Sequence, residues 1–250
     1  MSPVTHVVLP PPKAAGEVYV TLLRAIHAHL RPKTYLEVGT ESGVTLALAQ
    51  CASLAVDPAF QVRRDIIGRK PSLHVYQMTS DAFFRQHDPT AILGDRVDFA
   101  FLDGLHLCEF LLRDFVNTEK HCRRNSVIAL HDCVPSEIAM TRRVQEGPEK
   151  QRSARPNWWT GDVWKVVPIL KKYRPDLVIT IADAAPTGVV LITNLDPESR
   201  VLEASYAAIT QEMADLNLEA YGLDRFVEDC ALVPTESLLA FENLTSRFWF

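Results

Sequence analysis

Apolar and polar residues follow one another along the chain in blocks that predict short strands separated by helices. Apolar residues at helical spacing predict helices, for example over 16–30 and 107–121. Pro186 and Gly188 lie in the short link between the last two apolar runs, which is the pattern of an antiparallel hairpin. Runs rich in β-branched, aromatic and other apolar residues, typical of buried strands, lie at 34–38, 53–58, 73–78, 97–106, 126–130, 176–183 and 188–194.

This order of elements predicts an α/β fold: a doubly wound, mostly parallel sheet of seven strands with an antiparallel last strand. A length of 250 residues suits one such domain with a modest extension. We expect residues 1–32 to form an N-terminal tail and helix, residues 33–196 the sheet domain, and residues 197–250 a C-terminal helical extension. Within the sheet domain, residues 135–160 carry many charges and little apolar periodicity, which predicts a lid over a binding site.

Composition argues against several classes of protein. The net charge is −5 and no long Lys/Arg block stands out, so we expect no nucleic-acid partner. No apolar run approaches the length of a membrane span, and the N-terminus lacks a secretory signal. The five cysteines form no C-x-x-C pair, and an odd, scattered set of this kind indicates reduced thiols and a cytoplasmic location.

The stretch YLEVGTESGVT, residues 35–45, carries the first candidate site. Gly39 and Gly43 bracket a polar turn after a strand, and VTLALAQ predicts a helix that continues to about Ala52. Glycine allows a sharp turn and a close ligand, and a helix start offers unpaired N–H groups. The spacing E-x-G-x-x-x-G differs from the dinucleotide pattern G-x-G-x-x-G. Glu41 would repel a pyrophosphate but tolerate a cationic ligand, which favours S-adenosylmethionine over NAD.

Acidic residues also follow the second and third predicted strands. Asp57 comes twenty residues after Glu37 and ends the second strand, where an acidic side chain binds ribose hydroxyls in nucleotide-binding α/β folds. The alternative is a turn residue before Pro58. Ser80 and Asp81 follow the third strand and either cap the next helix or reach an adenine amino group.

Four residues with catalytic side chains follow the fourth and fifth strands: Asp103, His106, His131 and Asp132. Ligands of open α/β sheets bind beyond the carboxyl ends of the strands, and neighbouring strands lie about 5 Å apart, so these side chains can converge. They suit either a divalent metal or general base catalysis, with His106 the natural base near neutral pH. The alternative is that the carboxylates cap helices and the histidines line the pocket.

Five short motifs resemble, in order, the successive motifs of class I S-adenosylmethionine-dependent methyltransferases, and the resemblance covers residues 34–195. These motifs are EVGTESG, AVDP, TSDAFF, FLDGLH and LHDC. The sequence is similar to a bacterial small-molecule branch of this family, related to the catechol-type and macrolide-sugar O-methyltransferases, in the motifs FLDGLH, LHDC and GDVWK. The resemblance implies a Rossmann-like methyltransferase fold and methyl transfer to a hydroxyl of a small molecule, such as a sugar or natural product. The absence of the Asn/Asp-Pro-Pro-aromatic signature after the fourth strand favours oxygen over nitrogen as the acceptor.

The resemblance also implies roles for individual residues. In the catechol-type branch, an Asp after the fourth strand and an Asp-Asn pair after the fifth hold magnesium; here Asp103 matches the first, and His131 and Asp132 stand in place of the pair. The implied metal, Mg²⁺ or Mn²⁺, therefore stays open, as does a metal-free site with His131 as base. The implied catalytic residues are His106, Asp103 and His131. The implied cofactor contacts are Glu37, Gly39, Thr40, Gly43, Asp57, Ser80, Asp81 and Asp103.

Three other functions fit parts of the sequence: an NAD(P)-dependent oxidoreductase, a metal-dependent hydroxylase with His and Asp ligands to iron, and a catalytically silent module. As partners we expect a small-molecule substrate and no membrane. The aromatic ending SRFWF suggests a homo-oligomer formed through the C-terminal extension.

Overall fold

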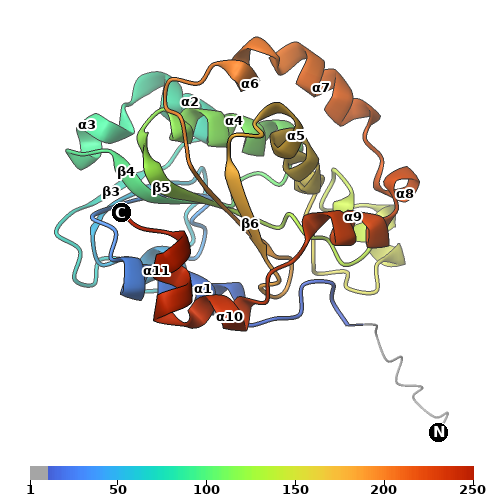
Figure 1. The fold of residues 1–250 in the computed structure, drawn as a ribbon, viewed down its shortest axis with the longest axis horizontal. Helices are drawn as coiled ribbons and strands as arrows, with labels where there is room; N and C mark the ends of the chain where they lie inside the picture. Colours follow the sequence, from blue (N-terminus) through green and yellow to red (C-terminus); the bar gives the residue numbers. More distant parts are fainter. Residues whose placement is uncertain (1–10) are drawn as a thin grey trace, which may run out of the picture.

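The computed structural model describes residues 11–250, and its centre is a twisted sheet (Figure 1). The strands are β1 (Thr34–Val38), β2 (Ala52–Val56), β3 (Leu73–Tyr76), β4 (Val97–Leu102), β5 (Cys122–His131), β6 (Val178–Ala182) and β7 (Val189–Thr193). Their order in this seven-stranded sheet is β3-β2-β1-β4-β5-β7-β6. Neighbours from β3 to β5 are parallel, and β7 runs antiparallel to both β5 and β6. The predicted fold class is therefore confirmed.

One face of the sheet packs against the two ends of the chain. The helices α1 (Tyr19–Leu30), α10 (Thr235–Leu239) and α11 (Phe241–Arg247) pack on one another along this face (Figure 1). Successive side chains of a strand point to opposite faces, so every second strand residue faces these helices. The buried strand residues of this cluster include Tyr35, Ala55, Phe99, Phe101, Ala129 and Leu191.

The other face carries the remaining long helices. Alternate strand residues such as Leu36, Leu54 and Ile128 form the second and larger buried cluster. Short helices α3 (Pro89–Leu93), α6 (Val201–Ala204) and α8 (Leu218–Tyr221) complete the chain. Leu93, Leu202 and Leu218 of these short helices join the same cluster. The longer helices whose apolar side chains join it are α2 (Ser80–Gln86), α4 (Cys108–Glu119), α5 (Val166–Tyr173), α7 (Tyr206–Asp215) and α9 (Leu223–Cys230).

The link between β1 and β2 differs from its prediction. We predicted an α-helix that continues to about Ala52, but the structure has only the 3-10 helix η1 (Leu46–Leu48) before β2 begins. β-branched residues at the start of VTLALAQ weaken a helix, and the link is too short for a long one. Leu46 and Ala49 are nevertheless buried in the cluster under α1. The predicted helix N-terminus at the glycine turn is therefore wrong.

The predicted lid, residues 135–160, contains only the short 3-10 helices η2 (Ile138–Thr141) and η3 (Pro148–Arg152). In the C-terminal extension, Phe248 is buried in the cluster beside α1, so this aromatic residue docks on its own domain. Most of the predicted N-terminal tail lies outside the described residues, and the boundaries of the three regions stay a prediction. No helix within residues 11–250 has the length and apolar character to cross a membrane.

Candidate active site

The predicted catalytic residues meet beyond the ends of β4 and β5. Asp103 Oδ1 lies 3.2 Å from Nδ1 of His131 and 3.4 Å from Nε2 of His106. Nδ1 of His106 lies 3.2 Å from Oδ2 of Asp132, and Nδ1 of His131 lies 3.5 Å from Oδ1 of the same carboxylate. The two carboxylates and two imidazoles thus form a closed network in which each imidazole lies next to both carboxylates.

Burial and charge act in opposite directions on this network. Burial alone would lower the pKa of each histidine, but the neighbouring carboxylates raise the pKa of His106 and of His131 to about 9. Burial would likewise raise the pKa of Asp103, but His131 and His106 hold it well below its ordinary value. At neutral pH, without ligands, the network therefore favours the protonated imidazoles of His106 and His131 and the charged carboxylate of Asp103.

Asp132 is held in an unusual backbone conformation. Its φ is 60°, in the left-handed region that non-glycine residues adopt rarely. Thr187, in the loop between β6 and β7, donates a hydrogen bond to Oδ1 of Asp132. Because strained backbone of this kind persists only where surrounding contacts fix it, the loop holds the carboxylate in place beside His131.

The donor set fits a divalent cation. Asp103, His131 and Asp132 each offer one ligand atom, and these atoms all lie within 4.8 Å of one another. Two carboxylates and one imidazole suit Mn²⁺ and related metals, and Thr187 orients one of the carboxylates as an outer-shell partner. Nε2 of His131 is buried and has no hydrogen-bond partner among the residues that the structure describes. The predicted metal ligands are therefore close enough to act together, although their role stays a prediction.

The glycine turn lies next to this network, but the protein's own atoms explain the need for glycine. Gly39 has a φ of 85°, and a Cβ there would lie 2.0 Å from the backbone oxygen of Asp103. At Gly43, with a φ of 79°, a Cβ would lie 2.5 Å from Ile66. The turn therefore packs directly on the end of β4 and on the loop after β2, rather than leaving both spaces to a ligand.

Two polar atoms of this turn are buried without a well-aligned hydrogen bond among residues 11–250. Oε1 of Glu37 and Oγ1 of Thr40 are inaccessible to solvent, and the hydroxyls of Thr40 and Thr45 lie close enough to Glu37 to lower its pKa. Burial raises the pKa of Glu37 to about 7, although the hydrogen bond from Tyr35 opposes the shift. Buried polar groups are almost always paired, so these orphaned atoms indicate a place for a polar ligand or water.

The predicted ribose and adenine residues already have partners. Each carboxylate oxygen of Asp57 accepts one backbone N–H, from Glu41 over 2.8 Å and from Ala59 over 2.7 Å. Asp81 forms a two-pronged ion pair with Arg113 of α4, at 2.9 and 2.7 Å. The cap of α2 is Thr79, not Ser80 or Asp81, because its hydroxyl accepts the N–H of Ala82. The capping interpretation is thus wrong by one residue, while the cofactor roles stay predictions.

The lid is attached to His106. The carbonyl oxygen of Trp159 lies 2.9 Å from Nδ1 of His106, and the two rings stack with centroids 5.0 Å apart. At Gly161, with a φ of 54°, a Cβ would lie only 1.6 Å from the backbone oxygen of His106. The lid therefore crosses the site at closest range over this histidine.

Comparison with known proteins identifies the domain. Residues 14–133 match the family model described as a methyltransferase domain. The chain carries a methyltransferase domain. This match spans β1, β2, β3, β4 and β5, with the glycine turn and the Asp–His network, and it confirms the class that the order of motifs predicted. No curated protein matches the sequence.

One solved structure shares the fold of this methyltransferase domain, and two others are similar to it more distantly. An O-methyltransferase from Bacillus cereus in complex with SAH is 15% identical, with a TM-score of 0.50 over 75% of this chain and 82% of its own. TomG, an O-methyltransferase from Streptomyces achromogenes, is 15% identical, with a TM-score of 0.46 over 70% and 78%. SAH-bound PaMTH1 from Podospora anserina is 14% identical, with a TM-score of 0.47 over 71% and 78%.

Three further residues lie near the network of the methyltransferase domain, and two of them, Tyr19 and Thr187, were missed in the sequence. The ring centroid of Tyr19 lies 4.2 Å from that of His131, Thr187 bonds to Asp132, and Trp159 covers His106. Tyr19 and Thr187 lie far from the recognised motifs, and no local pattern marks them. The pair of tryptophans in NWWTGDVWK was the only signal for Trp159.

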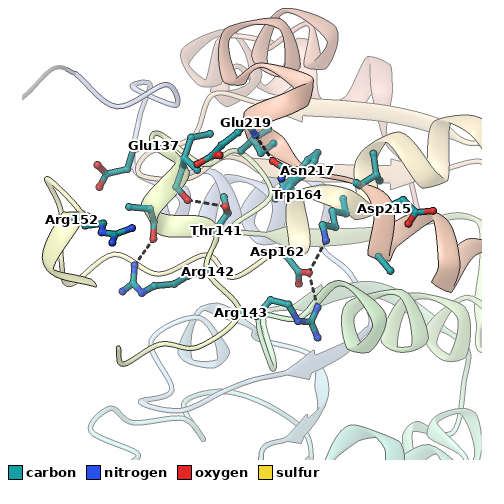
Figure 2. Close-up of a pocket in the computed structure, with 16 residues that line it drawn as sticks. Glu137, Thr141, Arg142, Arg143, Arg152, Asp162, Trp164, Asp215, Asn217 and Glu219 are labelled. Atoms are coloured by element: carbon teal, nitrogen blue, oxygen red, sulfur yellow. Dashed lines mark hydrogen bonds and ion pairs between the residues drawn. The ribbon is translucent and has the colours of Figure 1, made fainter. Parts of the chain in front are cut away.

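A cavity of about 720 Å³ lies between the lid and α8, and the predicted site residues do not line it (Figure 2). Asp162 lies in its wall and pairs with Arg143 over 2.6 Å and with Lys165 over 3.1 Å. Trp159 links the two regions, since its ring stacks on His106 while its Nε1 donates to the carbonyl of Arg142 on the cavity wall. Trp159 of the lid thus lies between the cavity and the Asp–His network.

Proposed function

We propose that this protein transfers a methyl group from S-adenosylmethionine to a hydroxyl of a small molecule. One observation carries the proposal: in a methyltransferase domain, the Asp–His network lies at the glycine turn, where buried polar atoms lack partners. Oε1 of Glu37 and Oγ1 of Thr40 suit the charged amino-acid end of the cofactor. The Bacillus cereus O-methyltransferase with this fold was solved in complex with SAH, which supports the same cofactor here.

Methyl transfer depends mainly on how the cofactor and the acceptor hydroxyl are positioned. The acceptor oxygen forms a bond to the methyl carbon while the carbon–sulfur bond breaks, its electron pair stays on sulfur, and S-adenosylhomocysteine leaves. The hydroxyl must also lose its proton. We assign the proton to the neutral form of His106, whose population rises as the pH approaches its pKa of about 9. The side chain of His106 is about one-fifth exposed and lies between Asp103 and Asp132.

We further propose that Asp103, His131 and Asp132 hold a divalent cation, Mg²⁺ or Mn²⁺. When bound, such a cation supplies Lewis-acid polarisation of the acceptor hydroxyl. Support comes from the spacing of the three ligand atoms and from the hydrogen bond of Thr187 to Asp132. Asp57 is proposed to add ribose hydroxyls to the two backbone N–H groups it already accepts. The lid over His106 is proposed to select the acceptor.

The proposal is tested by a thermal-shift panel of S-adenosylmethionine, S-adenosylhomocysteine, NAD and NADP, followed by methyl transfer to a library of hydroxylated small molecules. We expect stabilisation by the first two compounds alone and methylation at oxygen. Stabilisation by NAD or NADP alone would contradict it. The metal is tested by treatment with EDTA and add-back of Mn²⁺ or Mg²⁺, and unchanged turnover would contradict a metal role.

We propose a cytoplasmic location and a homo-oligomer for the same protein. All five cysteines are free and buried, which suits a reducing compartment. Phe241 and Trp249 of the C-terminal extension are 52% and 61% exposed, and they offer an apolar surface for a second copy. Light scattering after size-exclusion chromatography tests the assembly: a monomer mass would contradict it.

A further inference from the structure

Tyr19, the first residue of α1, packs against His131 of the active-site network. The centroid of its ring lies 4.2 Å from that of His131, with an angle of 34° between the planes. The same tyrosine stacks on Phe101 of β4 at 6.2 Å, and Phe101 lies 5.8 Å from His131. His131 therefore packs against two aromatic side chains that come from separate elements and contact each other.

The hydrogen bonds of His131 leave its orientation only half determined. Nδ1 faces Asp103 and Asp132, while Nε2 is buried and has no hydrogen-bond partner within the described part of the chain, residues 11–250. A metal-binding histidine usually donates its second ring N–H to a carboxylate or carbonyl, which fixes the ring. Because that second hydrogen bond is missing here, the aromatic contact is what opposes rotation of the ring about its Cβ–Cγ bond.

The position of Tyr19 is itself tied to the other side of the site. The N–H of Tyr19 donates to the carbonyl of Ala185 over 2.9 Å, and the N–H of Ala185 donates to the carbonyl of Glu17 over 2.9 Å. This loop between β6 and β7 also supplies Thr187, which bonds to Asp132. One loop therefore positions the carboxylate through Thr187 and the imidazole through Tyr19.

We propose that Tyr19 is a positioning residue that holds Nδ1 of His131 toward Asp103 and Asp132, so that the three side chains bind a divalent cation as a set. The proposal rests on the metal site of the proposed function. The aromatic ring of Tyr19, and not its hydroxyl, holds His131, because among residues 11–250 the hydroxyl makes no hydrogen bond. Phenylalanine should therefore replace it, and a small or flexible side chain should not.

The test compares Tyr19→Phe, Tyr19→Ala and Tyr19→Leu with the unaltered full-length chain. Tyr19→Leu keeps much of the apolar volume in case the alanine variant does not fold. Tyr173→Ala is the matched control, since Tyr173 is also partly buried but lies in α5, away from the site. Mn²⁺ binding is titrated by electron paramagnetic resonance, and the His131 ring is observed by NMR in the metal-free protein.

We expect Tyr19→Phe and Tyr173→Ala to bind Mn²⁺ like the unaltered chain, while Tyr19→Ala and Tyr19→Leu lose at least about tenfold in affinity. In the same two variants, contacts between the His131 and Phe101 rings should weaken in NMR. Equal Mn²⁺ affinity with an unchanged His131 ring in Tyr19→Ala or Tyr19→Leu would overturn the proposal, as would equal losses in Tyr19→Phe. If the unaltered chain binds no Mn²⁺, the metal site fails, and the NMR result alone decides whether Tyr19 positions His131.

Discussion

The phenol of Tyr35 donates a 2.5 Å hydrogen bond to Oε2 of Glu37, and both side chains are completely buried. Burial raises the pKa of Glu37 to about 7 against this hydrogen bond, while Asp103 adds to the rise. In the free protein the carboxyl group is therefore partly protonated at neutral pH. A cationic ligand group near its unpaired Oε1 would favour the charged form.

The first prediction concerns Glu37→Gln. Because the folded pKa lies above the ordinary value of 4.5, the native state binds more protons, and the free energy of unfolding falls as pH rises from about 4.5 to 7. Gln cannot titrate. The free energy of unfolding of the variant, relative to that of the unaltered chain, should therefore be higher at pH 8 than at pH 5 by on the order of 2–3 kcal/mol. Urea denaturation at both pH values measures this.

The same variant should bind S-adenosylmethionine more weakly, since it cannot supply a negative charge. A Glu37→Gln protein with the same pH dependence of stability as the unaltered chain would show that Glu37 titrates normally. Undiminished cofactor affinity would separately remove its binding role.

The second prediction concerns His27, whose two buried ring nitrogens have no hydrogen-bond partner from residue 11 to residue 250. Burial, and then Lys70, lower its pKa to about 3, so it stays neutral in the folded chain. The unfolded chain binds a proton below about pH 6.5, so this residue lowers stability as pH falls from 6.5 toward 3. His27→Phe keeps the ring contacts to Tyr35 and Phe99.

We expect His27→Phe to raise the free energy of unfolding by about 1 kcal/mol at pH 7, by removing unpaired polar atoms. The gain should grow by on the order of 3 kcal/mol at acid pH. Thermal unfolding between pH 4 and pH 8 checks this, and a gain that stays constant over that range would contradict a buried neutral His27.

Much of the fold could be predicted because each strand is a short apolar run that is followed by polar or charged residues. The four residues Asp103, His106, His131 and Asp132 were predictable as a group, since parallel strands bring their carboxyl ends to one edge. Tyr19 was not, because its contact with His131 depends on how α1 docks on the β6–β7 loop. Tertiary packing of this kind leaves no local pattern.

The missing helix after the glycine turn has a similar explanation. The apolar composition of residues 44–50 suited a helix, but burial under α1 and α11 can be satisfied by a single 3-10 turn. What covers this face is the C-terminal extension, which joins it from the far end of the chain. Helix propensity over seven residues does not reveal that the C-terminal extension, a distant segment, covers these side chains in place of a local helix.

The third prediction concerns Asp162, which holds the lid to α4. Its buried carboxylate accepts the N–H of Cys108 at the start of α4 over 2.9 Å and pairs with Arg143 and Lys165 (Figure 2). Asp162→Ala leaves buried groups unpaired and should cost about 3–5 kcal/mol of unfolding free energy. The matched control is Glu109→Ala, because Glu109 also pairs with Arg143 but is more exposed.

Glu109→Ala should cost less than about 1 kcal/mol, as exposed ion pairs usually do. Urea denaturation of both variants measures the difference. Equal losses would mean that Asp162 contributes only through Arg143, and that neither its α4 contact nor its pairing with Lys165 matters.

The fourth prediction concerns competition between His106 and a metal for the same carboxylates. His106 lies 3.4 Å from Asp103 and 3.2 Å from Asp132, and an imidazolium there repels a second cation. His106→Ala should therefore bind Mn²⁺ several-fold more tightly while methyl transfer falls by about 10²–10⁴-fold, as for loss of a general base. Asp132→Asn should bind Mn²⁺ at least about tenfold more weakly.

Mn²⁺ titration followed by electron paramagnetic resonance tests both variants. Weaker binding in His106→Ala would make His106 a ligand rather than a competitor. Full methyl transfer by the same variant would exclude it as the base.

Calorimetric titration of S-adenosylmethionine into the unaltered chain and into Asp57→Asn tests the central claim most directly. Asn keeps the size of Asp57 but removes the charge that accepts both the turn N–H groups and, by our proposal, the ribose hydroxyls. The account predicts binding of one molecule per chain, and at least about tenfold weaker binding in Asp57→Asn at equal folded content. No binding to the unaltered chain, or equal affinity in the variant, would contradict the account.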